Sequence, residues 1–189
     1  LSRSGGCTEA TAARWSGSRF MNVEVVIEDC RWEQAELERL SVKALQAVLA
    51  HFNLKSERFE IDILACNDAR IAQLNGDFRE NAKATNVLSW PSQERRAQED
   101  GADPNPFDQV ADDPSLGDIA LSYPTCLAEA DAAGLVFSDH ILHLLVHSML
   151  HLLGYDHKRD LDATLMEGLE IEILGKLGVN NPYKEMTKV

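Results

Sequence analysis

Three histidines in the C-terminal third of the chain have the residue type and spacing that suit a metal ion. They are His147, His151 and His157, in the stretch His-Ser-Met-Leu-His-Leu-Leu-Gly-Tyr-Asp-His. On an α-helix, His147 and His151 stand about 40° apart and one turn along the axis, so both imidazoles can reach one cation. Gly154 can adopt the left-handed conformation that ends a helix, and the reversal brings His157 to the same point. Three neutral nitrogens leave a fourth tetrahedral position open, which is typical of catalytic zinc.

Metzincin proteases share this ligand spacing, H-E-x-x-H-x-x-G-x-x-H. Those enzymes use the glutamate after the first histidine as the general base that activates the metal-bound water. The corresponding residue here is Ser148, whose hydroxyl cannot take up a proton near neutral pH. The sequence therefore predicts a metal-dependent hydrolase and argues against peptide hydrolysis. A zinc metalloprotease is the least favoured interpretation.

Two further histidines, His140 and His143, share the predicted helix and its broad face with His147. A histidine on an apolar helix is more often a hydrogen-bonded core residue than a ligand, and we interpret both as structural. His143 is nevertheless near enough in the helical register to support a ligand or to replace one.

The pattern of apolar residues predicts the elements that position these histidines. Alternating, β-branched segments indicate four strands, at residues 22–28, 59–65, 86–90 and 117–122. Helical spacing indicates five helices, at residues 33–50, 67–78, 124–133, 138–154 and 160–177. Ser138 is expected to cap the histidine helix. The last helix is expected to turn its acids outward and its apolar residues inward, namely Leu165, Leu169, Ile173 and Leu177. This order predicts a single α+β domain, a small mixed four-stranded sheet covered by about five or six helices.

Several segments do not fit that pattern. Residues 1–20 lack apolar periodicity and Met21 opens a strand, so we interpret residues 1–20 as a non-native or disordered extension and 21–185 as the domain. A transit peptide is a less favoured reading of the extension. Residues 92–115 are polar and contain three prolines, which indicates one long loop, a functional lid or a mobile insertion. Four scattered cysteines without a C-x-x-C pair indicate reduced thiols in a cytoplasmic protein. No apolar run is long enough to span a membrane.

The charge of the chain bears on its substrate. The net charge is −13, and because residues 1–20 carry three arginines and one glutamate, the rest of the chain has a net charge of −15. Nucleic-acid binding normally draws on lysine and arginine for its phosphate contacts. An RNA substrate therefore requires a local basic patch or a cation at the site.

Three blocks of the sequence, at residues 147–157, 74–91 and 116–119, together resemble those of a known family, the YbeY endoribonucleases. The stretch from His147 to His157 resembles the family signature H-G-x-L-H-L-x-G-Y-D-H and departs from it only at Ser148. The stretches 74–79 (Leu-Asn-Gly-Asp-Phe-Arg) and 85–91 (Thr-Asn-Val-Leu-Ser-Trp-Pro) resemble a second family block, and 116–119 (Leu-Gly-Asp-Ile) a third. Ala84 stands where the family usually has proline, which should loosen a turn, and the 92–115 loop looks longer than in many members. The resemblance covers residues 21 to 183.

The resemblance implies a single-strand-specific, metal-dependent endoribonuclease. By position it assigns one zinc ion per chain to His147, His151 and His157, and it assigns Arg79 to catalysis or phosphate binding. It implies a role in maturation of the 3′ end of the small-subunit (16S) ribosomal RNA and in ribosome quality control. The implied partners are precursor rRNA, the small ribosomal subunit and its assembly factors, and no membrane.

The identity of the general base stays open at this point. Asp118 and Asp156 are candidates, although Asp156 could equally orient a histidine. Seven cations could guide RNA to the site, namely Arg70, Arg79, Lys83, Arg95, Arg96, Lys158 and Arg159. For Arg95 and Arg96, however, a solvated surface charge is the favoured interpretation. The rival function is a non-catalytic ribosome assembly factor in which zinc only staples the C-terminal helices.

Overall fold

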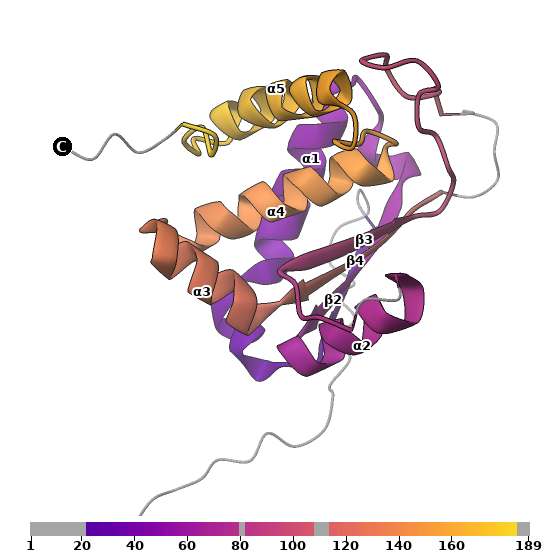
Figure 1. Cartoon of the computed structure of the whole chain (residues 1–189). Helices are drawn as coiled ribbons and strands as arrows, with labels where there is room; N and C mark the ends of the chain where they lie inside the picture. Colours follow the sequence, from indigo (N-terminus) through magenta and orange to yellow (C-terminus); the bar gives the residue numbers. More distant parts are fainter. Residues whose placement is uncertain (1–21, 80–81, 108–113, 185–189) are drawn as a thin grey trace, which may run out of the picture.

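The computed structural model describes residues 22–79, 82–107 and 114–184 (Figure 1). The expected extension, residues 1–20, therefore lies outside the described residues, as does part of the loop predicted at 92–115.

A mixed four-stranded sheet forms the centre of the domain. Strands β1 (Asn22–Ile27), β2 (Glu60–Cys66) and β4 (Ser115–Ser122) run parallel, and β3 (Val87–Pro91) pairs antiparallel with β4. The strand order is β1-β2-β4-β3, so β3 is an edge strand. We expected the third strand to stop before Pro91, but this proline is its last residue, which an edge strand tolerates. The mixed sheet confirms the predicted α+β fold.

The helices cover the sheet unequally (Figure 1). Helices α1 (Leu37–His51), α4 (Phe137–Leu152) and α5 (Asp160–Lys176) lie on one side, and α2 (Asp68–Arg79) lies on the other. Helix α3 (Tyr123–Ala133) leads from β4 into α4. The main core is continuous between the sheet, α1 and α4, whereas a small separate cluster lies under α2, made of Cys66, Ile71, Leu88 and Ala120.

Helix α4 is the central helix, because it packs against α1, α5, α3 and β3. Such a position requires apolar residues nearly all round the helix, and the buried set includes Ile141, Leu145 and Met149. The helix begins at Phe137 after Val136, which provides no side-chain cap. The prediction that Ser138 caps this helix was therefore wrong, since Ser138 lies inside the first turn and packing supplies the stability that a cap would add.

The helix predicted at residues 33–50 is divided. A 3₁₀ helix, η1 (Cys30–Ala35), comes first, and Glu36 then adopts the left-handed conformation (φ 53°) before α1 begins. The side chain of Asp29 accepts a hydrogen bond from the backbone N–H of Arg31 at 3.2 Å and caps η1. The apolar face predicted for the longer helix is confirmed within α1, where Leu37, Leu40, Ala44, Leu45, Val48 and Leu49 are buried. A further short 3₁₀ turn, η2 (Ser56–Arg58), precedes β2.

Helix α5 is rotated relative to the prediction. Its buried residues are Asp162, Met166, Glu170, Ile173 and Leu174. Of the inner face that we expected only Ile173 is buried, and two of the acids that we expected outside are buried. Leu165, Leu169 and Leu177 are only half-buried. Burying a carboxylate is costly unless it is hydrogen-bonded, so two buried acids on one face indicate donors on the elements that α5 contacts.

The described part of the long loop is attached to the junction between α4 and α5. The Arg159 guanidinium donates hydrogen bonds to the carbonyls of Ala97, Gln98 and Glu99 at 2.9–3.1 Å. The backbone N–H of Gly101 donates to Asp162 at 2.8 Å. These contacts place residues 97–101 beside the junction between α4 and α5.

Among the described residues, no single helix is long and apolar enough to cross a membrane. Helices α3 and α4 would reach that length only together, and they are bent by 116° at the break between them.

Candidate metal centre

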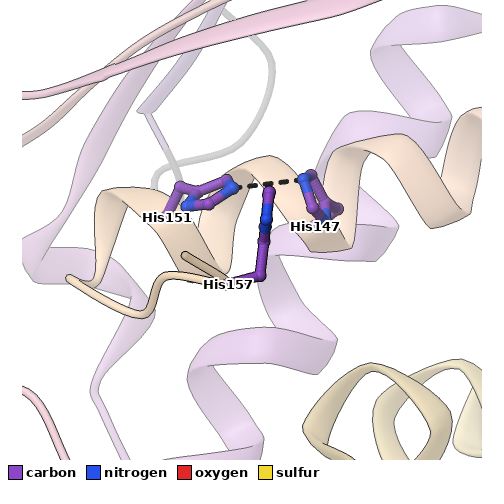
Figure 2. A group of neighbouring side chains, drawn as sticks. All are labelled: His147, His151 and His157. Carbon is purple, nitrogen blue, oxygen red and sulfur yellow. Dashed lines mark hydrogen bonds between the residues drawn. The ribbon is translucent and has the colours of Figure 1, made fainter. Parts of the chain in front are cut away.

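The three predicted ligands meet at the C-terminal end of α4 (Figure 2). His147 and His151 extend from successive turns of the helix, and His157 reaches back toward them from the segment that follows it. The two Nε2 atoms of His147 and His151 lie 3.1 Å apart. One ligand nitrogen from each of the three rings lies within 4.8 Å of the other two. The structure thus brings together the group that the sequence singled out.

Gly154 makes the chain reversal that returns His157. Its φ is +102°, in the region that residues with a side chain rarely adopt. A Cβ atom on this residue would also lie 2.8 Å from the Cβ of Arg95 and 3.0 Å from that of Pro104. Two independent requirements, backbone conformation and close approach of the loop, therefore demand glycine here.

His151 is fixed by the main chain. Its Nδ1 lies 2.9 Å from the carbonyl oxygen of Tyr155, and because a carbonyl can only accept, Nδ1 carries the proton. Burial, and to a smaller extent the neighbouring His147, lower the pKa of His151 to about 4. The ring is therefore neutral near pH 7, and its Nε2 lone pair is available to a cation.

His147 is fixed by a buried carboxylate. Its Nδ1 lies 2.8 Å from Oε1 of Glu170, and the other carboxylate oxygen lies 2.8 Å from Nε2 of His143. Burial raises the pKa of Glu170, but hydrogen bonds from His143, His147 and Tyr183 outweigh burial and lower it to about 2. Glu170 is therefore ionised and can only accept, so Nδ1 of His147 is the donor.

These hydrogen bonds make the three nitrogens fit a metal. Since the Nδ1 atoms of His147 and His151 are both held by acceptors, the two Nε2 atoms face each other 3.1 Å apart. A cation shared between two Nε2 lone pairs would take the place of a proton between them. Two nitrogens bound tetrahedrally to zinc at about 2.0–2.1 Å lie about 3.3 Å apart. Within the described ranges, no other three His, Cys, Asp or Glu side chains bring their ligand atoms within 4.8 Å of one another.

A cavity of about 440 Å³ opens beside the histidines. Its wall combines the edge strand β3, the attached loop and the segment after α4. Arg95, Arg96 and Lys158 contribute positive charge to the wall, and Glu94 and Asp156 contribute negative charge. The remaining lining residues are Ser89, Pro91, His151, Gly154, Tyr155 and His157. Because two of the ligands line this cavity, a molecule inside it reaches the metal position directly.

Comparison with known proteins identifies the family of the chain. Residues 22–178 match the family model described as endoribonuclease YbeY. The chain belongs to the YbeY family. Among relatives named endoribonuclease YbeY, that of Ruegeria sp. (strain TM1040) is 55% identical over 164 residues, which cover 86% of this chain and 96% of the relative. That of Paracoccus denitrificans (strain Pd 1222) is 52% identical, covering 86% and 90%. The likeness to a solution structure from Thermotoga maritima is weaker, with 20% identity and a TM-score of 0.49 over 86% of this chain and 99% of the other.

In this YbeY family member, Asp156 contacts the main chain of a ligand residue. Its carboxylate accepts a hydrogen bond from the backbone N–H of His157 at 2.8 Å. Arg96 and Lys158 lie 3.5 Å and 3.6 Å from the same side chain. Burial raises the pKa of Asp156, but the hydrogen bond from His157 and the two cations outweigh it, so the pKa is lowered. A carboxylate with a lowered pKa is a weak base, and its contacts suit the anchoring of His157.

Asp118 is not brought together with the histidines. It pairs in register with Asp62 and Trp90. Side chains alternate along a strand, which puts Asp118 on the same face of the sheet as Ala120, under α2. Helix α4 packs on the opposite face. The backbone of Arg79 forms the last residue of α2, and its side chain lies outside the described part of the chain.

The prediction that Arg95 is a solvated surface charge was wrong. Its residue exposure is 5%, and its guanidinium lies 3.5 Å from the centre of the Phe107 ring and donates to Gln93 at 2.9 Å. A cation over an aromatic face is stabilised by the ring quadrupole. The sequence could not show this contact, since it depends on how the loop folds back over Gly154.

The other cations that we predicted to guide RNA do not form one patch. Lys158 is exposed at the cavity, and Arg96 lies between Asp156 and Asp162. Arg159 donates hydrogen bonds to the loop carbonyls of Ala97, Gln98 and Glu99. Arg70 pairs with Glu28 at 3.3 Å on the α2 side of the sheet, and Lys83 is exposed before β3.

His140 lies outside the metal group, whereas Glu170 is hydrogen-bonded to one of its histidines. His140 bonds Glu129 through Nε2 at 3.0 Å and stays outside the metal group. Glu170 is the functional candidate that sequence reasoning missed. The available signal was a glutamate whose neighbours at helical spacing, Met166, Ile173 and Leu174, are apolar.

Proposed function

We propose that the chain is a metal-dependent endoribonuclease that cleaves single-stranded ribosomal RNA during maturation of the 16S 3′ end. The observation that carries this proposal is the convergence of three ligand nitrogens within 4.8 Å at a partly basic cavity, in a chain that belongs to a family named for endoribonuclease activity. We assign residues 21–185 to the catalytic domain.

His147, His151 and His157 would hold one zinc ion per chain. Such an ion supplies Lewis acidity toward a phosphoryl oxygen. The chain itself orients the two helical ligands, His151 through the Tyr155 carbonyl and His147 through Glu170. Asp156 anchors the main chain of His157. The cations at the cavity wall offset the overall acidity of the protein where the RNA backbone must approach.

Arg79 would bind the phosphate group that is cleaved. A guanidinium grips a phosphate through two parallel N–H···O bonds and stabilises the charge that develops in the transition state. This role follows from the position of Arg79 in the family-like block at residues 74–79. We expect Arg79→Ala to lower kcat by about 10²- to 10³-fold and to leave zinc affinity unchanged.

A protease reading gains no support from the structure. Ser148 occupies the position of the protease base, and its exposure is 1% because it faces the core and not the cavity. A substituted glutamate at this position would therefore be buried. A protease function would be supported if the protein cleaved casein and lost that activity when a chelator removed the metal.

The second candidate is an assembly factor in which zinc only joins the C-terminal helices. The exposed position of His157 and the cavity beside it favour catalysis, since a purely structural ion is normally enclosed by four protein ligands. In either case we propose that the partners are precursor rRNA, the small ribosomal subunit and its assembly factors, and that the protein works in the cytoplasm and in ribosome quality control.

Cleavage of a 3′-extended small-subunit rRNA fragment tests the proposal. Zinc-loaded wild type is compared with Arg79→Ala and His151→Ala, and a duplex RNA of the same length serves as the substrate control. We expect wild type to cut the single strand and both variants to lose most of that activity. Intact RNA in every lane, together with ribosome binding that survives Arg79→Ala, would favour the assembly factor.

A further inference from the structure

We propose that Glu170 is a positioning residue for the metal, which sets the tautomer and direction of His147 from a separate helix. This inference rests on the proposed metal site and adds a fourth side chain to it. Glu170 lies on α5, whereas the ligands belong to α4 and the segment after it. The metal centre would thus depend on how α5 packs against α4.

The two oxygens of Glu170 are divided between different tasks. Oε1 is 2.8 Å from Nδ1 of His147 and has no second partner among the described residues. Oε2 accepts from Nε2 of His143 at 2.8 Å and from the hydroxyl of Tyr183. Two donors on one oxygen fix the plane of the carboxylate. The other oxygen is then left to fix one ligand ring.

This arrangement determines which nitrogen of His147 can bind a cation. An ionised carboxylate accepts and cannot donate, so it selects the His147 tautomer with the proton on Nδ1. The lone pair is then on Nε2, which is the atom that lies 3.1 Å from Nε2 of His151. Hydrogen bonding of this kind also raises the basicity of a metal-binding imidazole.

Packing alone does not explain a glutamate at this position. Glu170 is 1% exposed, and the residues that share its face of α5 include Met166, Ile173 and Leu174. A leucine or methionine would fill such a site without the desolvation that a carboxylate suffers. A buried carboxylate at this position is explained by its hydrogen bond to the imidazole of His147.

Helix α4 contains a control for the pair of His147 and Glu170, namely the pair of His140 and Glu129. His140 forms the same type of bond with Glu129, at 3.0 Å and on α3, but His140 has no place in the metal cluster. Removing the charge of Glu129 therefore disturbs a comparable histidine–carboxylate pair of α4 without touching a ligand. Glu170→Gln and Glu129→Gln are both near-isosteric.

The test is zinc affinity, measured on the full chain by competition with a chromophoric chelator and without RNA. We expect Glu170→Gln to weaken zinc binding roughly 10- to 100-fold, and Glu129→Gln to stay within about twofold of wild type. Equal affinities for folded Glu170→Gln and wild type would overturn the positioning role and leave the metal site intact. A wild type that binds no zinc would overturn the proposed site and this inference together.

A second measurement needs no variant and remains decisive if Glu170→Gln does not fold. Long-range ¹H–¹⁵N correlation spectra of the metal-free wild type report which imidazole nitrogen carries the proton. We expect His147 to show the proton on Nδ1. A His147 whose Nδ1 carries no proton in the metal-free protein would contradict the proposed clamp directly.

Discussion

The two ends of α4 each carry a histidine bonded to a glutamate, and the two pairs use different nitrogens. At the N-terminal end His140 bonds Glu129 through Nε2, and its Nδ1 is buried without a partner. At the C-terminal end His147 bonds Glu170 through Nδ1, which leaves Nε2 directed at His151 (Figure 2). The carboxylates differ too, since the Glu129 side chain is 42% exposed and that of Glu170 is 1% exposed. A histidine–carboxylate pair therefore becomes part of a metal site only when the other nitrogen faces further ligands.

The largest expected effect is on zinc binding, when one histidine is removed from either end of α4. His151→Ala should abolish zinc binding at micromolar zinc, because two nitrogens remain of a three-nitrogen site. His140→Ala should bind zinc like wild type, although its stability falls. Calorimetric titration of both variants with zinc measures the difference, and weakened binding in His140→Ala comparable to that in His151→Ala would remove the distinction between the two ends.

Gly154→Ala should disturb the C-terminal end through the backbone. The left-handed φ and the close approach of Arg95 each oppose a methyl group, so we expect a loss of about 3 kcal/mol in the free energy of unfolding. That corresponds to a Tm of the metal-free protein about 6–12 °C lower. Gly168→Ala is the control, since a Cβ atom there meets nothing within 4 Å. Thermal unfolding of both variants gives the comparison, and a wild-type Tm for Gly154→Ala would show that the turn does not require glycine.

Zinc should stabilise the folded chain through the histidines at the C-terminal end of α4 and independently of the His140–Glu129 pair. At a free zinc concentration about 100 times the dissociation constant, binding adds about 2.7 kcal/mol to the free energy of unfolding. The wild-type Tm should then rise by about 5–11 °C. Glu129→Gln should show the same rise and His151→Ala none. Scanning calorimetry with and without zinc measures the shifts, and a rise in His151→Ala would place the ion elsewhere.

The smallest expected effect concerns the charge at the cavity. Lys158 is exposed beside the ligands, whereas Lys176 lies at the end of α5 next to His51. Lys158→Ala should weaken RNA binding modestly and reduce the slope of log K against log salt by about 1 if it neutralises one phosphate. Lys176→Ala should change neither quantity. Binding of a labelled single strand at several salt concentrations distinguishes the two lysines, and identical slopes would exclude Lys158 from the RNA path.

The features that the sequence predicted best are local ones. His147, His151, Gly154 and His157 lie within one helix and its reversal, so their spacing along the chain determines their arrangement in space. The strands and helices also follow from local patterns of apolar residues, and their order along the chain indicated the mixed sheet. The break at Glu36 was missed because no glycine or proline marks that left-handed residue.

The features that the sequence did not predict depend on contacts between distant segments. The rotation of α5 results from partners for Asp162 and Glu170 that lie on the loop, on α4 and at Tyr183. The burial of Arg95 depends on Phe107 and on the loop passing over Gly154. Amphipathic spacing counts every charge as an outward residue, so a buried acid with a specific donor is outside what such a pattern can predict.

Zinc titration of the metal-free protein, with cleavage of a single-stranded rRNA fragment as the readout, tests the proposed function most directly. If the three histidines form the centre that cleaves RNA, activity should be absent without metal, rise in proportion to added zinc and level off at one equivalent per chain. His151→Ala should stay inactive throughout the titration. Full cleavage by metal-free wild type, or equal cleavage by His151→Ala, would contradict the assignment of RNA cleavage to this site.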